Sequence, residues 1–111
     1  MAFGLGKSPH RELAANELAD LLSKSAALVV DVREPNEFAE GHIPGALNMP
    51  LSRFDPAALP HPEGKTLVLN CLGGKRSAMA LEKCGIAQKA VDTHLAGGFG
   101  AWQSAGLPVE R

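Results

Sequence analysis

The stretch from residue 66 to residue 78 has the sequence "TLVLNCLGGKRSA". It begins with an apolar run typical of a strand that is buried on both faces of a parallel sheet. Two glycines permit a tight turn, and residues 76–86 then place apolar side chains at helical spacing, with Gly85 as the expected C-cap. The sequence therefore predicts a strand, a turn and a helix, with Cys71 at the carboxyl end of the strand, where sheets of this kind bind ligands.

Strand-like and helix-like segments alternate along the rest of the chain, with no repeat and no linker between them. This alternation predicts a single α/β domain built on a parallel sheet. Asn16 is expected to cap the first helix, Gly41 to stop the second and Gly106 to cap the last. The expected elements are a helix over 15–24, a strand over 27–32, a short helix over 34–40, a strand over 46–50, a surface loop over 55–64, a strand over 90–95 and a closing helix over 97–108.

The composition is that of an ordinary single domain, with 111 residues of which 45% are apolar. Eleven basic and twelve acidic side chains give a net charge of −1, which argues against nucleic acid or an anionic membrane as a partner, because proteins that bind them usually carry a basic excess. No apolar run approaches the roughly 20 residues of a membrane span. Residues 1–10 are expected to form a loose leader and residues 11–111 the domain. The leader has no apolar stretch long enough for a secretory signal, which favours a cytoplasmic location.

Neither the cysteines nor the histidines form a recognisable disulfide or metal pattern. Two cysteines do not make a disulfide framework, which suits a reducing compartment. The four histidines, at positions 10, 42, 61 and 94, share no ligand spacing with the cysteines. We therefore expect no zinc or other metal site.

Residues 71–77, "CLGGKRS", combine the features that a reactive cysteine needs. The two glycines let the backbone approach a ligand closely, and the unpaired N–H groups of the following helix face whatever lies in the loop. We expect these groups, with Lys75 and Arg76, to hold the pKa of Cys71 below the free value of about 8.5. No histidine neighbours Cys71 in the sequence, so this field rather than a general base is expected to activate the thiol. The alternative is a core cysteine before an ordinary turn.

Three stretches of the chain resemble the signature stretches of single-domain rhodaneses. They are "DVREPNEFAEGHIPGALNMP" (31–50), "CLGGKRS" (71–77) and "LAGGFGAWQSAGLPV" (95–109), and with their spacing they cover all but the leader. The resemblance implies a five-stranded parallel sheet flanked by helices on both faces. It also implies transfer of a sulfane sulfur through a persulfide on Cys71, from thiosulfate, a persulfide or a polysulfide to cyanide or a thiol, protein thiols among them, without a cofactor. The implied anion-binding loop consists of Leu72, Gly73, Gly74, Lys75, Arg76 and Ser77.

Other residues that match the family pattern are expected to serve the scaffold. Asp31, Arg33 and Glu37 are expected to pair and to fix the loop after the first strand. His42 is expected to hydrogen-bond to the backbone, and Trp102 to pack in the core. In thiosulfate-using tandem-domain members of the family, the residue before the aromatic of the first signature is often arginine, whereas here it is Glu37. A persulfide or a polysulfide is therefore as suitable a donor as thiosulfate.

Three other functions remain open at this point. Cell-cycle phosphatases share this architecture, but their pattern has five residues between the cysteine and the arginine, whereas residues 72–75 make four. A thiol–disulfide switch would join Cys71 to Cys84, which we expect instead in the core, about eight residues along the helix and too far away for a disulfide. A catalytically silent binding module usually lacks the loop cysteine that this chain has.

Overall fold

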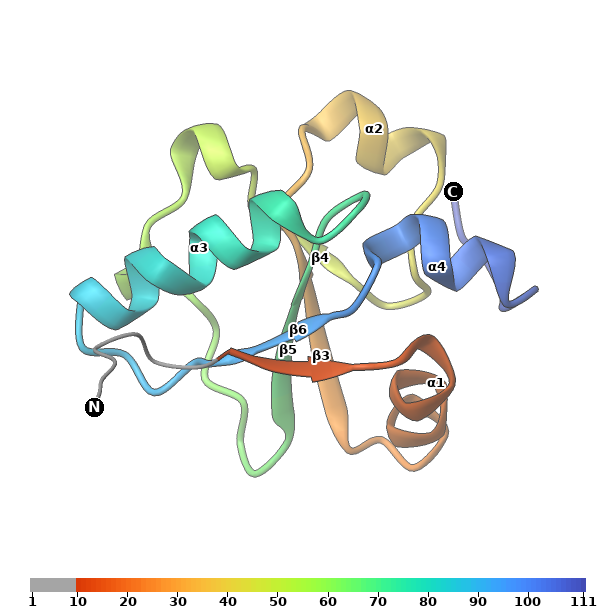
Figure 1. Cartoon of the computed structure of the whole chain (residues 1–111), viewed down its shortest axis with the longest axis horizontal. Coiled ribbons are helices and arrows are strands. Elements are labelled where there is room, and N and C mark those ends of the chain that lie inside the picture. Colours follow the sequence, from red (N-terminus) through yellow and green to blue (C-terminus); the bar gives the residue numbers. More distant parts are fainter. Residues whose placement is uncertain (1–9) are drawn as a thin grey trace, which may run out of the picture.

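Five parallel strands form the centre of the structure (Figure 1), a computed structural model that describes residues 10–111. The strands do not follow one another in sequence order, and the strand that leads into Cys71 lies in the middle of the sheet. The five-stranded parallel sheet implied by the resemblance is confirmed. Across the sheet the strands are β2 (Arg11–Leu13), β6 (Thr93–Leu95), β5 (Thr66–Asn70), β3 (Ala27–Asp31) and β4 (Leu47–Asn48).

Helices cover both faces of this sheet (Figure 1). They are α1 (Ala15–Ser23), α2 (Pro35–Glu40), α3 (Lys75–Ile86) and α4 (Gly98–Ser104), with two 3₁₀ turns, η1 (Leu51–Arg53) and η2 (Pro56–Ala58). α1 and α4 pack on one face of the sheet, and α3 and the segment with the 3₁₀ turns pack on the other. α2 lies beyond the carboxyl ends of the strands, because it directly follows β3.

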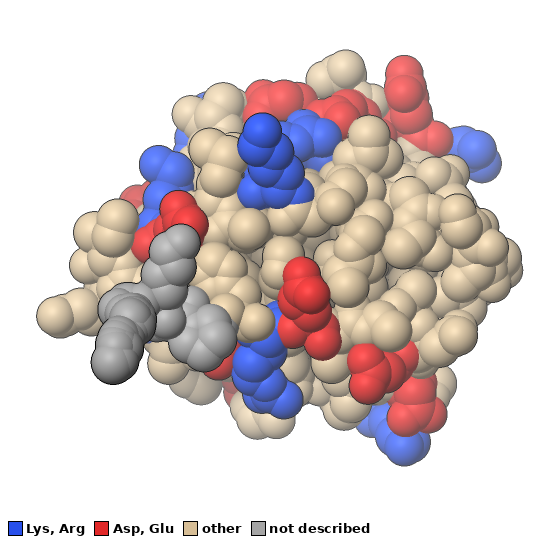
Figure 2. Space-filling view, in the orientation of Figure 1, with Lys and Arg blue, Asp and Glu red and all other residues tan. Residues whose placement is uncertain are grey.

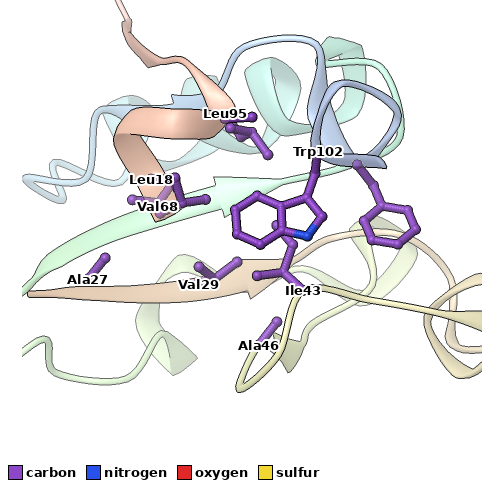
Figure 3. Close-up of a cluster of buried hydrophobic side chains, with 10 residues drawn as sticks. Leu18, Ala27, Val29, Ile43, Ala46, Val68, Leu95 and Trp102 are labelled. Carbon is purple, nitrogen blue, oxygen red and sulfur yellow. The ribbon is translucent and has the colours of Figure 1, made fainter. Parts of the chain in front are cut away.

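Each central strand contributes to two separate cores, because its side chains alternate between the two faces of the sheet. In β3, Ala27 and Val29 face α1 and α4, whereas Val30 faces α3. Figure 3 shows the first core, where the indole of Trp102 lies over Ile43. The first core consists of Ala15, Leu18, Ala27, Val29, Ile43, Ala46, Val68, Leu95, Phe99 and Trp102. The second consists of Val30, Val32, Leu67, Leu69, Cys71, Ala80 and Leu81.

The N-terminal part of the domain differs from the prediction. The structure has an edge strand, β2, that pairs with β6, where the sequence predicted no strand. This pairing keeps the chain extended up to Ala14, so Ala14 and not Asn16 is the N-cap residue of α1. The backbone N–H of Ala14 donates to Glu17 Oε1 at 2.8 Å, which stabilises the start of the helix without a capping side chain at Ala14 itself. Of the predicted leader, residues 1–9 lie outside the described part of the chain.

The C-terminal ends of α3 and α4 and the loop over 55–64 agree only in part with the prediction. α3 runs through Gly85, so the predicted C-cap is wrong, and Ala87 takes that place. The left-handed conformation that often follows a helix is adopted here by Gln88, with a φ of 59°. The predicted surface loop over 55–64 contains a 3₁₀ turn, η2. Gly106 follows the end of α4 with a φ of 71°, as expected of a glycine that ends a helix.

The surface carries both signs of charge. On the face seen in Figure 2, basic and acidic side chains lie in small mixed groups, and much of the area carries neither. Among the described residues, no helix is long and apolar enough to cross a membrane. The visible face therefore presents no broad basic surface of the kind that binds nucleic acid.

Candidate active site

Cys71 is the first residue after β5, the central strand of the sheet. It is 1% exposed and packs in the second core, whereas the next residue, Leu72, is 48% exposed. α3 begins at Lys75, and Gly74 precedes it with a φ of 105°, a conformation that favours glycine. The strand, turn and helix predicted from residues 66–78 are confirmed, and they place the Cys71 side chain beside the N-terminus of α3.

The sulfur of Cys71 has polar neighbours within its own loop. The backbone N–H of Gly74 donates to Cys71 Sγ at 3.0 Å, and Ser77 Oγ lies 3.5 Å from the same sulfur. Burial raises the pKa of the Cys71 thiol, but hydrogen bonds from Ser77 and from the N–H groups of the two glycines outweigh burial and lower the pKa below its ordinary value. The loop therefore favours the thiolate, which is the nucleophilic form of cysteine.

The start of α4 holds the cysteine loop from its other side. The Phe99 N–H donates to the carbonyl oxygen of Cys71 at 2.7 Å, and the Gly100 N–H donates to the carbonyl oxygen of Leu72 at 3.0 Å. A side chain at Gly98 would collide with both of these carbonyl groups, and Gly98 has a φ of 59°. Glycine is required there for close approach, so the third signature stretch positions the loop that contains the cysteine.

Arg76 is bound to a carboxylate at the edge of the loop. Its Nη1 and Nη2 atoms donate to the two carboxylate oxygens of Glu37 at 2.7 and 3.0 Å. The hydrogen bond from Arg76 lowers the pKa of Glu37 from 4.5 to about 2. Glu37 Oε1 also accepts the N–H of Glu34 at 3.0 Å, so the pair joins the start of α2 to the start of α3. The positive charge predicted for the loop is thus largely offset at Arg76, while Lys75 is exposed and makes no ion pair with any described residue.

The prediction that Glu37 joins Asp31 and Arg33 is wrong. Asp31 and Arg33 form a buried pair with each other, with Arg33 Nη2 donating to Asp31 Oδ2 at 2.8 Å. Arg33 Nη2 also donates to the carbonyl oxygen of Gly41 at 2.7 Å, and its guanidinium lies 4.5 Å from the centre of the Phe99 ring. These contacts satisfy Arg33 without Glu37. The pair joins the end of β3 to the end of α2 and to α4, and so belongs to the scaffold.

A histidine that the sequence did not connect with Cys71 lies two hydrogen bonds from it. Ser77 Oγ is 2.8 Å from Nδ1 of His94, which lies in β6 and is 4% exposed. His94 Nε2 in turn lies 3.4 Å from Glu12 Oε2 in β2. Sequence reasoning missed this histidine because it considered only the neighbours of Cys71 along the chain. The available signal was a histidine in the strand predicted over 90–95, since β6 pairs with β5 in the sheet.

Three other residues have the structural roles that the sequence predicted. Cys84 in α3 is fully buried, burial raises the pKa of its thiol, and both cysteines are free. His42 Nδ1 is 2.7 Å from the carbonyl oxygen of Phe38. Trp102 is 2% exposed, and its Nε1 donates to the carbonyl oxygen of Pro108 at 2.6 Å. These three side chains stabilise the fold around the loop.

A cavity of about 310 Å³ lies beside the cysteine loop, and Leu72, Phe99 and Glu37 are among the residues that line it. A larger cavity, of about 470 Å³, opens at the amino ends of β5 and β6. Because Cys71 lies at the carboxyl end of β5, the smaller cavity is the one at the same end of the sheet as the cysteine loop, and Leu72 is the loop residue that lines it.

Comparisons with known proteins agree with this geometry. The family model for the rhodanese-like domain matches residues 14–105. An uncharacterised protein of Synechocystis sp. is 46% identical over 99 residues, which cover 89% of this chain and 55% of that protein. A sulfurtransferase of Allochromatium vinosum is 31% identical over 99 residues, which cover 88% of this chain and 92% of that protein.

A solved structure is similar over almost the same part of the chain. It is a rhodanese-related protein from Thermoplasma volcanium, with a TM-score of 0.76 and 32% identity over 91% of this chain and 98% of that one. The chain thus spans about half the length of the Synechocystis protein and nearly the whole of the other two. Since the family model covers four of the five strands, the cysteine loop and α4, the chain belongs to the rhodanese-like domain family.

Proposed function

We propose that this protein is a sulfurtransferase that carries a sulfane sulfur as a persulfide on Cys71. The proposal is based on one observation, the hydrogen bond from the Gly74 N–H to Cys71 Sγ at the N-terminus of α3. Backbone N–H groups and the positive end of a helix stabilise an anion, and the terminal sulfur of a persulfide is an anion at this position. The family and the sulfurtransferase among the relatives support the same chemistry.

The reaction has two half-reactions, each of which displaces a group at sulfur. The Cys71 thiolate first attacks the outer sulfur of the donor, whose S–S bond breaks. The leaving group departs with the electron pair, as sulfite from thiosulfate or as a thiolate from a persulfide, and Cys71 retains the sulfur as Cys–S–S⁻. Cyanide or a thiolate then attacks the terminal sulfur and leaves as thiocyanate or as a new persulfide, which restores the Cys71 thiolate. Both steps balance without a cofactor or an external oxidant.

The residues from Leu72 to Ser77 form the proposed binding loop for the transferred sulfur. Gly73 and Gly74 contribute backbone N–H groups that already lower the pKa of the thiol, and Ser77 contributes its hydroxyl. Lys75 is exposed and adds a positive charge that can attract an anionic donor. Leu72, which is exposed and lines the neighbouring cavity, offers apolar contact to the body of a donor or an acceptor.

The ion pair between Arg76 and Glu37 bears on the choice of donor. Arg76 gives both of its terminal nitrogens to Glu37, so its charge is largely offset before a donor arrives. Thiosulfate is a dianion and gains most from an unpaired arginine, whereas a persulfide or a polysulfide presents less charge. We therefore propose that persulfide and polysulfide donors are used at least as well as thiosulfate. The proposed acceptors are small thiols, protein thiols or cyanide, in a reducing compartment such as the cytoplasm.

Phosphate-ester hydrolysis is the main competing chemistry, and two features disfavour it. Four residues separate Cys71 from Arg76, one fewer than in the phosphatase pattern, which leaves less room for a tetrahedral phosphoryl group. The guanidinium of Arg76 is bound to Glu37 and is not free to bind phosphate oxygens. A silent binding module is disfavoured because the loop keeps its cysteine and lowers the thiol pKa.

Intact-mass spectrometry after incubation with each donor tests the proposal. We expect the mass to rise by one sulfur atom with thiosulfate, a glutathione persulfide or a polysulfide, and the added sulfur to map to Cys71 and to leave on reduction. The Cys71→Ser variant is the control for specific loading, and the Cys84→Ala variant should load like the unmodified protein. No loading from any donor, together with aryl phosphate hydrolysis that depends on Cys71, would reverse the assignment in favour of a phosphatase.

A further inference from the structure

A line of polar contacts runs from the Cys71 sulfur through the interior to the edge of the sheet. Cys71 Sγ is 3.5 Å from Ser77 Oγ, which is 2.8 Å from His94 Nδ1. On the other side of the imidazole ring, His94 Nε2 is 3.4 Å from Glu12 Oε2. Ser77 is fully buried and His94 is 4% exposed, whereas the Glu12 side chain is 60% exposed. The line therefore connects a buried thiol with a carboxylate at the surface.

Ser77 has one hydroxyl proton to share among its neighbours. Its Oγ can donate to His94 Nδ1, to the carbonyl oxygen of Gly74 at 3.2 Å or to Cys71 Sγ. When neutral His94 holds its proton on Nε2, facing Glu12, its Nδ1 accepts the Ser77 proton. Ser77 Oγ then offers a lone pair to the Cys71 thiol. When Nδ1 also holds a proton, it donates to Ser77 Oγ and leaves the hydroxyl proton free for the Cys71 thiolate.

We propose that His94 is a positioning residue that takes up the proton of Cys71 through Ser77, so that the thiolate and the imidazolium form together. The S–H bond of Cys71 breaks as an O–H bond forms on Ser77. The original O–H bond of Ser77 breaks as an N–H bond forms on His94 Nδ1. One proton moves at each bond, Ser77 stays neutral, and the net charge of the protein does not change.

The surroundings of His94 suit this role. Burial lowers the pKa of His94, so it is neutral near pH 7 and its Nδ1 is able to accept a proton. Glu12 from β2 opposes the effect of burial, because its carboxylate stabilises the imidazolium once it forms. Two other titratable groups face His94: Cys71, through Ser77, and His10, whose ring centre is 5.9 Å away and which adds to burial in lowering the pKa of His94. The imidazolium thus forms between the Cys71 thiolate, which it faces through Ser77, and the Glu12 carboxylate.

This inference deepens the proposed function, because sulfur transfer needs the Cys71 thiolate, but it is measurable without sulfur transfer. Coupled groups titrate in macroscopic steps that belong to the pair. If Cys71 and His94 share one proton, the fraction of Cys71 in the thiolate form should rise in two steps with pH. The first step comes when the pair loses its first proton, a plateau follows, and the second step comes when the pair loses its second proton. If the Ser77–His94 contact is only structural, the thiolate appears in a single step.

The first test is the rate of Cys71 alkylation by iodoacetamide against pH, with peptide mapping to read Cys71 alone. We expect two steps in the unmodified protein and one step in His94→Asn, whose amide oxygen can accept the Ser77 hydrogen bond but takes up no proton. At pH 7 we expect the variant to react about tenfold more slowly, which corresponds to one pKa unit. His61→Asn removes an exposed histidine elsewhere and should keep both steps. Superimposable profiles for the unmodified protein and His94→Asn would overturn the proposal.

The second test asks whether His94 acts through Ser77. In a Ser77→Ala background, His94→Asn should have no further effect on Cys71 alkylation, because the route for the proton is already broken. An equal effect of His94→Asn in both backgrounds would overturn the proposed route.

The third test uses Glu12→Gln, which changes an exposed side chain and keeps the experiment decisive if His94→Asn does not fold. Loss of the carboxylate should lower the plateau rate several-fold, because the imidazolium becomes less stable, and an unchanged plateau would contradict the proposal. Sulfur loading is measured in parallel on the same samples. A two-step alkylation profile without loading would reject the sulfurtransferase proposal and keep the role of His94.

Discussion

The two cysteines of this chain lie at opposite ends of one helix, and both are buried, but the pKa values of their thiols shift in opposite directions. Cys71 lies just before the N-terminus of α3, and Cys84 lies in the last turn of the same helix. Cys71 is 1% exposed and Cys84 is 0% exposed. The pKa of the Cys71 thiol is lowered nonetheless, while that of the Cys84 thiol is raised.

The difference lies in the donors that each sulfur meets. Burial raises the pKa of both thiols, since it disfavours the charged form. At the N-terminus of α3, free N–H groups point outward and the Gly74 N–H reaches Cys71 Sγ at 3.0 Å. Near the C-terminus, the charge of Lys89 lowers the pKa of Cys84 but does not outweigh burial. The comparison shows that local hydrogen-bond donors, and not exposure, decide the direction in which the pKa of a buried thiol shifts.

The largest expected effect separates the two cysteines by activity. Cys71→Ser should reduce sulfur loading and thiocyanate formation to background, because a serine hydroxyl holds no sulfane sulfur. Cys84→Ala should keep the activity of the unmodified protein, since Cys84 is buried in α3 and away from the loop. Thiocyanate release with each donor measures both variants. Activity that survives in Cys71→Ser would remove the contrast between the two sulfurs.

The next effect is a difference in reactivity within one sample. At pH 8 we expect iodoacetamide to modify Cys71 at least about tenfold faster than Cys84, because only Cys71 has a lowered pKa and one pKa unit corresponds to a factor of about ten. Peptide mapping of partly alkylated protein gives both rates at once. Denatured protein is the control, in which the two rates should converge. Equal rates in the folded protein would show that the donors of the loop do not activate Cys71.

A smaller effect concerns the contribution of Cys84 to stability. Cys84→Ala removes a buried side chain and should cost about 1–2 kcal/mol in the free energy of unfolding, measured by urea denaturation at pH 7. Cys71→Ser changes a side chain at the edge of the second core and is the matched comparison. No loss of stability in Cys84→Ala would contradict its assignment to the core.

The stability that Cys84 contributes should also depend on pH. Its pKa is raised in the folded state, so its contribution is full below the ordinary value of 9.0 and is lost as the pH rises from there through the raised value. The cost of Cys84→Ala should therefore shrink between pH 8 and pH 10.5, by at most about 1.4 kcal/mol for each pKa unit of the shift. Paired urea curves at the two pH values measure this change. A cost that stays constant would indicate that the Cys84 thiol titrates normally in the fold.

The smallest effect concerns the ion pair beside the Cys71 loop. The pKa of Glu37 is lowered to about 2, so the stability it adds is present above 4.5 and is lost as the pH falls from 4.5 through 2. Both side chains are about a third exposed, 32% for Arg76 and 29% for Glu37, so solvent screening limits the loss to about 1 kcal/mol or less. Glu37→Gln should lower the melting temperature slightly at pH 7, and this difference should shrink as the pH falls toward 2. An equal difference at both pH values would assign Glu37 a role other than the charge pair.

The central strands and the turn at Cys71 were predictable because their signals are local. The apolar runs in β3 and β5 and the two glycines before Lys75 leave few alternatives for the chain. The edge strand β2 was not predictable, since "REL" has one apolar residue and becomes a strand only by pairing with β6. Natural edge strands are often short and carry charged side chains, so they offer little hydrophobic pattern to recognise.

The partners of the charged residues were not predictable for a different reason. Asp31, Arg33 and Glu37 lie close together in the sequence, and nothing local distinguishes which carboxylate binds which arginine. Arg76 competes for Glu37 from 39 residues away, and the contact exists only once α2 and α3 meet. The Ser77–His94 contact depends in the same way on β6 lying beside β5.

The central place of β5 in the sheet bears on how firmly the start of the cysteine loop is held. β5 pairs with a strand on each side, β3 and β6, so its backbone hydrogen bonds cannot break by local fraying as those of an edge strand can. Amides of such a strand exchange with solvent hydrogen only when the whole domain opens, whereas those of β2 and β4 exchange through local fraying. Cys71 follows directly on the strand that opens least often, so the base of the cysteine loop is held in place even when the edges of the sheet fray. Deuterium uptake should be slowest in β5 and faster in β2 and β4.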